Sequence, residues 1–224
     1  MFSRRLDSEA RAKAWLGRGE LRRNRALAGT LIRHTQRSAA ASGLPVFEID
    51  ERLQHGDDFG QRLADAFQQV FSLGYRAVIA IGNDCPSIAQ TDWQAITAAL
   101  ASGQTVIGPT PHGGAYLIGL QAAQFDPQAF ATLAWQCRAT WHSLRNHLLD
   151  AGCDLHDQLP CLADLNTEED IRRVLMAHPK PSGVLRLIAD LLHPAHPHAL
   201  SDTRLHAPPR AHRRLLRGPP ATVN

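Results

Sequence analysis

One short apolar run constrains the fold of this chain more than any other sequence feature. Residues 77–81 read Ala-Val-Ile-Ala-Ile without polar alternation, which is typical of a strand covered on both faces in a parallel sheet. Gly82 ends the run, and Pro86 prevents the strand from continuing. Because open α/β sheets bind ligands beyond the carboxyl ends of their strands, the sequence predicts an α/β fold with Asp84 at its functional edge.

An acidic residue at a strand end suits a hard divalent cation. Mg²⁺ and Mn²⁺ bind carboxylate oxygens and share their remaining positions with substrate phosphates. Asp84 is therefore a candidate metal ligand. The alternative is a loop carboxylate that only caps a turn.

Periodicity, caps and turn residues predict the other elements. Helices are expected over residues 20–41, 58–73, 92–103, 138–151, 167–177 and 184–192, and one more begins at Asp126. Short strands are expected over residues 45–49, 104–109, 115–120 and 153–155. The glycine turn at 110–114 joins the strands expected over 104–109 and 115–120 into a hairpin-like unit with His112 at its tip.

The length of 224 residues fits one α/β domain with its own core. We place this domain at residues 1–178 and a possible docking helix within 179–192. From residue 193 onward Pro, His and Arg dominate, so 193–224 is expected to be a disordered basic tail. The histidines at 193, 196 and 198 offer a transition-metal alternative, but a solvated tail is the favoured interpretation.

Charge is segregated along the chain. Residues 1–40 hold ten Arg or Lys and three acids, whereas residues 41–192 hold nine and seventeen. The acidic middle argues against a nucleic-acid-binding surface, because phosphate binding needs basic residues along the docking face. No apolar run approaches the roughly 20 residues that span a bilayer, and the Arg-rich start lacks the apolar segment of a secretory signal. A cytoplasmic protein without a membrane span is expected.

The four cysteines show neither paired nor metal-binding spacing and are expected to be reduced thiols. Cys85 adjoins Asp84, and a neighbouring carboxylate disfavours the thiolate that a nucleophile needs.

Two further residues are candidates for ligand binding or catalysis. Arg62 lies one turn into the helix expected from residue 58, where it can reach an anion at the helix entrance. A pair with Asp58 at i, i+4 is the alternative. His112, in its glycine turn, is a candidate general base, although a surface histidine in such a turn is more often inert.

Several sequence blocks resemble a known family. They are Q-H-G-D-D-F-G-Q-R-L (54–63), G-Y-R-A-V-I-A-I-G-N-D-C-P (74–86), G-P-T-P-H-G-G-A-Y-L-I-G-L (108–120), Trp135 and L-A-D-L-N-T-E-E-D-I (162–171). Their order is that of a bacterial glycosyltransferase-like family of the radical-SAM/selenodomain-associated transferase type, which resembles nucleotide-diphospho-sugar transferases of the GT-A fold. The match covers roughly residues 43–175.

The resemblance implies a three-layer α/β/α sandwich around a mostly parallel sheet, with a nucleotide or nucleotide-sugar and Mg²⁺ or Mn²⁺ at the strand ends. Asp84 takes the place of the acid in the family's G-S-D-C-P block, and Asp164 that of the first acid in its D-x-D-T block. Asn166 stands at the second acid of that block and offers a neutral oxygen. The residues expected to bind substrate or nucleotide are Lys13, Arg62, Gly82, Asn83, Gly113 and Gly114.

The chain also departs from the family. His112 replaces the Asp of an Asp-Gly-Gly turn, and imidazole is a poorer ligand for Mg²⁺ than carboxylate. The K-T-R-L-like block is nearest to residues 13–16, where Trp15 replaces the arginine. Only Met1 and Phe2 precede the first arginines, so the family's first strand is expected to be missing or encoded upstream.

Three functional hypotheses remain open at this point. The first is a metal-dependent glycosyltransferase acting on a nucleotide-activated sugar. The second is a nucleotidyltransferase, in which a phosphorylated small molecule attacks a nucleoside triphosphate and pyrophosphate is released. The third is a non-catalytic module that binds nucleotide or another protein, and the sequence makes no prediction of oligomeric state.

Overall fold

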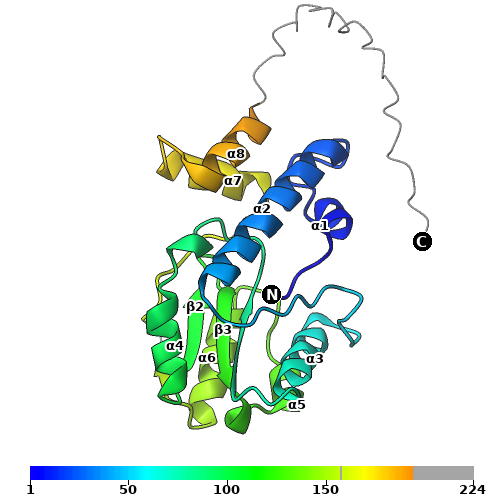
Figure 1. The fold of residues 1–224 in the computed structure, drawn as a ribbon. Coiled ribbons are helices and arrows are strands. Elements are labelled where there is room, and N and C mark those ends of the chain that lie inside the picture. The colour runs from blue at the N-terminus through cyan, green and yellow to red at the C-terminus, as the bar shows by residue number, and fades with distance from the viewer. Residues whose placement is uncertain (157, 194–224) are drawn as a thin grey trace, which may run out of the picture. The chain divides into compact units, whose positions relative to one another are not determined.

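The computed structural model describes residues 1–156 and 158–193 (Figure 1). Within them the apolar run forms the strand β1 (Ala77–Ile81), at one edge of a four-stranded sheet. The order is β1, β3 (Ala115–Gln121), β2 (Thr105–Pro109) and β4 (Leu155–His156). Residues 194–224 of the predicted tail, with His196 and His198 of the suggested metal site, lie outside the described residues.

The expectation of a mostly parallel sheet is wrong. β3 runs antiparallel to both β1 and β2, and only β2 and β4 pair in parallel. A short turn joins β2 to β3, and a short turn can connect only antiparallel strands. β1 and β2 still point the same way, with β3 inserted between them. The apolar run showed only that β1 is covered by helices on both faces, and it carried no information on whether the neighbouring strand runs parallel or antiparallel.

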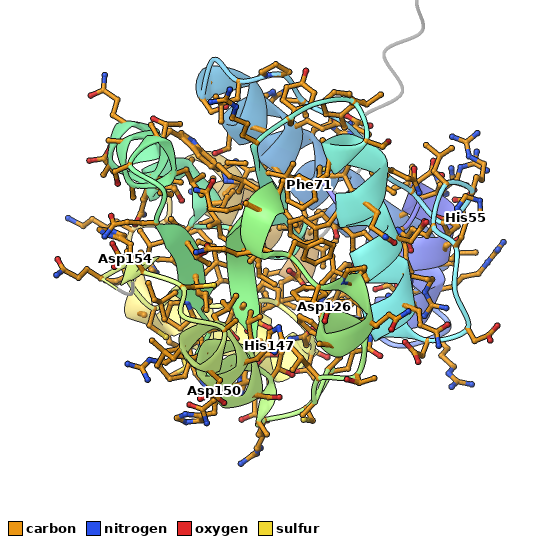
Figure 2. The ribbon with its side chains drawn as sticks, turned by 90° about the horizontal axis from the view of Figure 1, so that it is seen from below. His55, Phe71, Asp126, His147, Asp150 and Asp154 are labelled. Carbon is orange, nitrogen blue, oxygen red and sulfur yellow. The ribbon has the colours of Figure 1, made fainter. Side chains whose placement is uncertain are left out.

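Helices cover both faces of the sheet, as Figure 2 shows from below: α6 (Thr140–Asp150), which carries His147 and Asp150, lies on one side of the strands and α2 (Leu21–Ala41) on the other. The face toward α6 also packs on α3 (Phe59–Phe71) and α5 (Pro127–Ala131). The opposite face packs on α4 (Trp93–Ala101) and on Ala39 of α2. Alternate strand residues enter the two cores, with Ile107 and Ile118 in one and Val106 and Leu117 in the other.

Most predicted helices are confirmed to within three residues at each end. The remaining elements are α1 (Leu6–Lys13), α7 (Glu168–Ala177), α8 (Gly183–Leu192) and the 3₁₀ turns Ile88–Gln90 and Ala122–Gln124. The strand predicted over 45–49 is reduced to one parallel bridge between Ile49 and Phe2. The strand predicted over 153–155 lies slightly later, as β4. No helix in the described ranges is long and apolar enough to cross a membrane.

A third apolar core joins α1, α2, α7 and α8 beside the sheet. Leu27 and Leu31 of α2 pack there with Ile171 of α7 and Ile188 of α8. The predicted docking helix is therefore α8, and Arg23 of α2 holds its end by donating hydrogen bonds to the carbonyl oxygens of its last two residues, at 2.7 and 3.1 Å.

Candidate functional site

A cavity of about 820 Å³ lies beyond the carboxyl end of β1, among α1, the β2–β3 turn and the segment before α7. We call it the site cavity. Of the ten residues predicted for the site, nine line it: Lys13, Arg62, Gly82, Asn83, Asp84, His112, Gly114, Asp164 and Asn166. Gly113 lies in the turn behind them and does not line the cavity.

The three predicted metal-binding residues lie in one hydrogen-bonded group. Lys13 Nζ donates to Asp84 Oδ2 at 2.8 Å and also to Asn166 Oδ1. Asn166 Nδ2 in turn donates to Asp164 Oδ2 at 2.6 Å. The backbone closes the group, because Leu165 N donates to the carbonyl oxygen of Asp84 at 2.8 Å. An ammonium group thus bridges two of the oxygen atoms proposed for a cation.

Trp15 explains how Lys13 reaches this group. Its indole is 2% exposed, and Nε1 donates to the carbonyl oxygen of Leu165 at 2.8 Å. Asn24 fixes the following turn, because its side chain accepts from Leu16 N and donates to the carbonyl oxygen of Gly17. Sequence comparison treated Trp15 as a lost phosphate contact, whereas here it is a core residue that anchors the end of α1.

The site cavity concentrates negative charge near Lys13. Burial, and then the charge of Asp84, raises the pKa of Asp164 above its usual value. Burial likewise raises the pKa of Glu9, a residue that sequence reasoning missed and whose side chain is only 3% exposed. Arg4 lies 3.4 Å from Glu9. The part of the shift that comes from repulsion between Asp84 and Asp164 is one that a nearby positive charge relieves, whereas the part that comes from burial is not.

Three buried polar atoms on residues that line the site cavity have no hydrogen-bond partner in the described part of the chain. They are Asn83 Nδ2, Asp164 Oδ1 and the Tyr116 hydroxyl. Leaving such atoms unpaired costs about 1–3 kcal/mol each, so they mark places where a ligand or water completes the structure. Burial also raises the pKa of the Tyr116 phenol, which keeps it a hydrogen-bond donor at neutral pH.

Tyr116 was also missed, although it stands two residues after the glycine turn. Its ring lies over Gly108 on the neighbouring strand, where an added Cβ would stand 2.4 Å from the ring. Glycine at position 108 therefore makes room for the ring of this residue, which is among those that line the site cavity.

The side chains at the site cavity supply fewer oxygen ligands than a divalent cation needs to complete its coordination. No three His, Cys, Asp or Glu side chains cluster for metal binding within 1–156 and 158–193. Asp84 and Asp164, with the Asn166 oxygen, nevertheless suit Mg²⁺ or Mn²⁺, which are commonly held by one or two carboxylates and complete their coordination with water and substrate phosphates. The residues fit a metal shared with a ligand.

The β2–β3 turn places His112 toward α7. Its Nε2 lies 3.0 Å from Asp170 Oδ1 and 3.2 Å from Arg173 Nη1. Asp170 also caps α7 by accepting from the backbone of Thr167. Gly113 adopts φ +80°, and an added Cβ would lie 2.0 Å from the carbonyl oxygen of Arg138, so only glycine fits there.

Arg62 reaches the site cavity without the predicted partner. Asp58 caps α3 by accepting from Gln61 N at 2.8 Å and does not pair with Arg62. Among the described residues, Arg62 Nη1 makes only long contacts of 3.4 and 3.3 Å, with the carbonyl oxygens of Gly56 and Asp57. Its guanidinium therefore keeps donors for an anion in the site cavity.

Cys85 does not act as a nucleophile in this site. It is buried, and burial followed by the charge of Asp84 raises its pKa to about 12. The thiolate form is therefore negligible at neutral pH.

Residues 18–136, more than half of the 224, match the family described as "Uncharacterized protein conserved in bacteria (DUF2064)", and the chain belongs to this family. No curated protein matches the chain. The fold is similar to a crystal structure from Desulfovibrio desulfuricans G20, described as a "putative nucleotide-diphospho-sugar transferase". The TM-score is 0.67 and the identity 20%, covering 84% of this chain and 92% of the other. This likeness shows an α/β fold that resembles the fold of that putative transferase.

Proposed function

We propose that this DUF2064 protein binds a nucleotide-diphospho-sugar in the site cavity and transfers its sugar with the aid of Mg²⁺ or Mn²⁺. The observation that carries the proposal is the convergence of Asp84, Asp164 and Asn166 with two cationic side chains, Lys13 and Arg62, at the end of β1. A diphosphate needs both features, because its charge is neutralised partly by cationic side chains and partly by a shared metal.

In this proposal Lys13 and Arg62 bind the diphosphate, and Lys13 exchanges its carboxylate partner Asp84 for phosphate oxygens. The chemistry that a divalent cation supplies in such a site is neutralisation of the departing nucleoside diphosphate. Tyr116 and Asn83 donate hydrogen bonds from the cavity wall, where they now lack partners. Gly82 and Gly114 line the site cavity where the backbone can approach the ligand closely. His112 is the proposed base for the acceptor hydroxyl.

The first test is thermal unfolding with nucleoside diphosphates, nucleoside triphosphates and nucleotide sugars, each with and without Mg²⁺ or Mn²⁺. A ligand at 100 times its dissociation constant adds about 2.7 kcal/mol, which raises the unfolding midpoint by several degrees. The metal-dependent part of the shift should disappear in Asp84→Asn. Asp150→Asn is the matched control, since Asp150 lies at the end of α6 and does not line the site cavity.

The outcomes separate the hypotheses. A shift that persists unchanged in Asp84→Asn contradicts the proposed metal site. Release of pyrophosphate from a nucleoside triphosphate supports the nucleotidyltransferase alternative instead. Absence of any shift across the panel supports a non-catalytic module. For the proposed base, His112→Gln should lower transfer while nucleotide binding is retained.

A further inference from the structure

One wall of the site cavity is the segment between α5 and α6, residues 132–139, which we call the α5–α6 loop. It contributes Trp135, Gln136, Cys137 and Arg138 to the lining of the cavity. None of these four side chains has a role in the proposed transfer. The loop is therefore a wall of the site cavity whose chemistry is not yet assigned.

Hydrogen bonds hold the α5–α6 loop in one conformation. Thr140 Oγ1 accepts from Cys137 N at 3.2 Å and donates to the carbonyl oxygen of Cys137 at 2.9 Å. Trp135 Nε1 donates to the carbonyl oxygen of Phe130 at 2.9 Å. Gln136 has φ +55°, which is uncommon outside glycine and persists only where the surrounding structure enforces it. The loop thus presents its side chains to the site cavity from a fixed backbone.

The α5–α6 loop also packs against the turn that carries His112. Trp141 N, just after the loop, donates to the carbonyl oxygen of Gly113 at 2.7 Å. An added Cβ on Gly113 would lie 2.0 Å from the carbonyl oxygen of Arg138, so the two backbones are in direct contact. Arg138 is therefore fixed beside the residue that follows His112, the proposed base.

Charge is distributed unevenly around the site cavity. The acids that line it all contact α1 or the group around Lys13: Glu9 lies on α1, Glu51 accepts from Arg5 N and Ser8 Oγ, Asp84 accepts from Lys13, and Asp164 accepts from Asn166. Arg4 and Lys13 form ion pairs with two of these acids. Within residues 1–156 and 158–193, neither Arg62 nor Arg138 pairs with a carboxylate. Two arginines of the cavity thus keep their charge for a ligand.

The proposed donor substrate uses only one of these two arginines. Its diphosphate is matched by Lys13, Arg62 and a divalent cation in the proposed function. Arg138 remains, and a planar guanidinium binds a phosphate or carboxylate group through paired N–H donors. Because Arg138 is fixed beside the turn of His112, such a group belongs to the molecule whose hydroxyl His112 deprotonates.

We propose that Arg138 forms an anion subsite for the acceptor, which is therefore a small molecule with a hydroxyl and a phosphate or carboxylate group. The role as acceptor subsite rests on the proposed transferase function, whereas the binding of an anion at Arg138 does not.

Cys137 is an exposed thiol next to Arg138 in the cavity lining, and it reports on this subsite. Iodoacetate and iodoacetamide are similar in size, but only iodoacetate carries the negative charge that Arg138 attracts. The ratio of their reaction rates at Cys137, measured by peptide mapping, should fall about threefold in Arg138→Gln, because one cation near the thiolate is lost. Cys161 is the internal control, since it is exposed and does not line the site cavity. Arg172→Gln on α7 is the matched control variant.

Protection by simple anions tells phosphate from carboxylate. Inorganic phosphate and acetate, compared at constant ionic strength, should slow the reaction of Cys137 with iodoacetamide in the unaltered protein and not in Arg138→Gln. Stronger protection by phosphate supports a phosphorylated acceptor, and stronger protection by acetate supports a carboxylic acid. Arg138→Gln should also leave the thermal shift with a nucleoside diphosphate unchanged, whereas Arg62→Gln should reduce it.

Two results would overturn the proposal. Equal iodoacetate-to-iodoacetamide ratios in the unaltered protein and in Arg138→Gln would remove the anion subsite. A loss of nucleoside diphosphate binding in Arg138→Gln as large as in Arg62→Gln would assign Arg138 to the donor instead of the acceptor. Labelling involves no nucleotide, so its failure leaves the transferase proposal standing, and failure of nucleotide binding leaves the anion subsite standing.

Discussion

Replacing Tyr116 by Phe removes one buried oxygen and leaves the aromatic ring in place. Tyr116 is 2% exposed, and its hydroxyl has no hydrogen-bond partner within the described residues. An unpaired buried polar group costs roughly 1–3 kcal/mol, and an ordered water can recover part of this. We therefore expect Tyr116→Phe to stabilise the ligand-free protein by about 1 kcal/mol, which raises the unfolding midpoint by about 2–4 °C.

Under the proposed function, in which the Tyr116 hydroxyl donates to the ligand, the same change should also weaken ligand binding. Loss of one neutral hydrogen bond of about 1 kcal/mol corresponds to about a fivefold higher dissociation constant for the nucleotide sugar. Thermal unfolding and calorimetric titration measure the two effects. Tyr75→Phe is the control, since Tyr75 is 36% exposed and should change stability by less than about 0.5 kcal/mol. A lower midpoint for Tyr116→Phe than for the unaltered protein would refute the reasoning.

Three other predictions follow from single residues. The pKa of Asp164 is raised in the folded protein, so between pH 3.8 and this higher pKa the folded protein binds more protons than the unfolded chain. The contribution of Asp164 to the free energy of unfolding therefore falls as the pH rises through this range. Asp164→Asn should remove this pH dependence from a series of denaturation midpoints. Gly113→Ala should destabilise by at least about 1–3 kcal/mol in denaturant titration, because the added Cβ meets the carbonyl oxygen of Arg138 at positive φ, and unchanged stability would contradict the turn geometry. Iodoacetamide at pH 8 should label exposed Cys137 and spare Cys85 until the protein unfolds, as peptide mapping would show.

Local signals carried most of the prediction. The apolar run and the glycine after it, Gly82, located β1 correctly. Asp84 follows the carboxyl end of that strand in the sequence, and this alone was enough to predict that it lies at the site cavity. Helix bounds followed from caps that act over two or three residues, such as Asp126 at α5 and Thr167 at α7.

The remaining features depend on contacts between distant residues. Trp15 donates to a carbonyl oxygen 150 positions away, and no spacing rule connects the two. The Tyr116 hydroxyl reaches the site cavity because its ring packs over Gly108 on the adjacent strand. The hairpin-like pairing of β2 with β3 was predicted correctly, but the mostly parallel sheet was not, because an unbroken apolar run reports helices on both faces and not the direction of the neighbouring strand. The Lys13–Asp84 pair was not predicted either.

Helix α8 lies away from the sheet in Figure 1, yet its packing helps to hold the wall of the site cavity in place. Its Ile188 shares a core with Trp15, and Trp15 secures the end of α1 next to Lys13. Trp15 and Ile188 belong to the same buried core, so α8 supports the end of α1 that carries Lys13. A domain that ended at residue 178 would lack α8, and we expect the position of Lys13, near the start of the chain, to depend on this late helix.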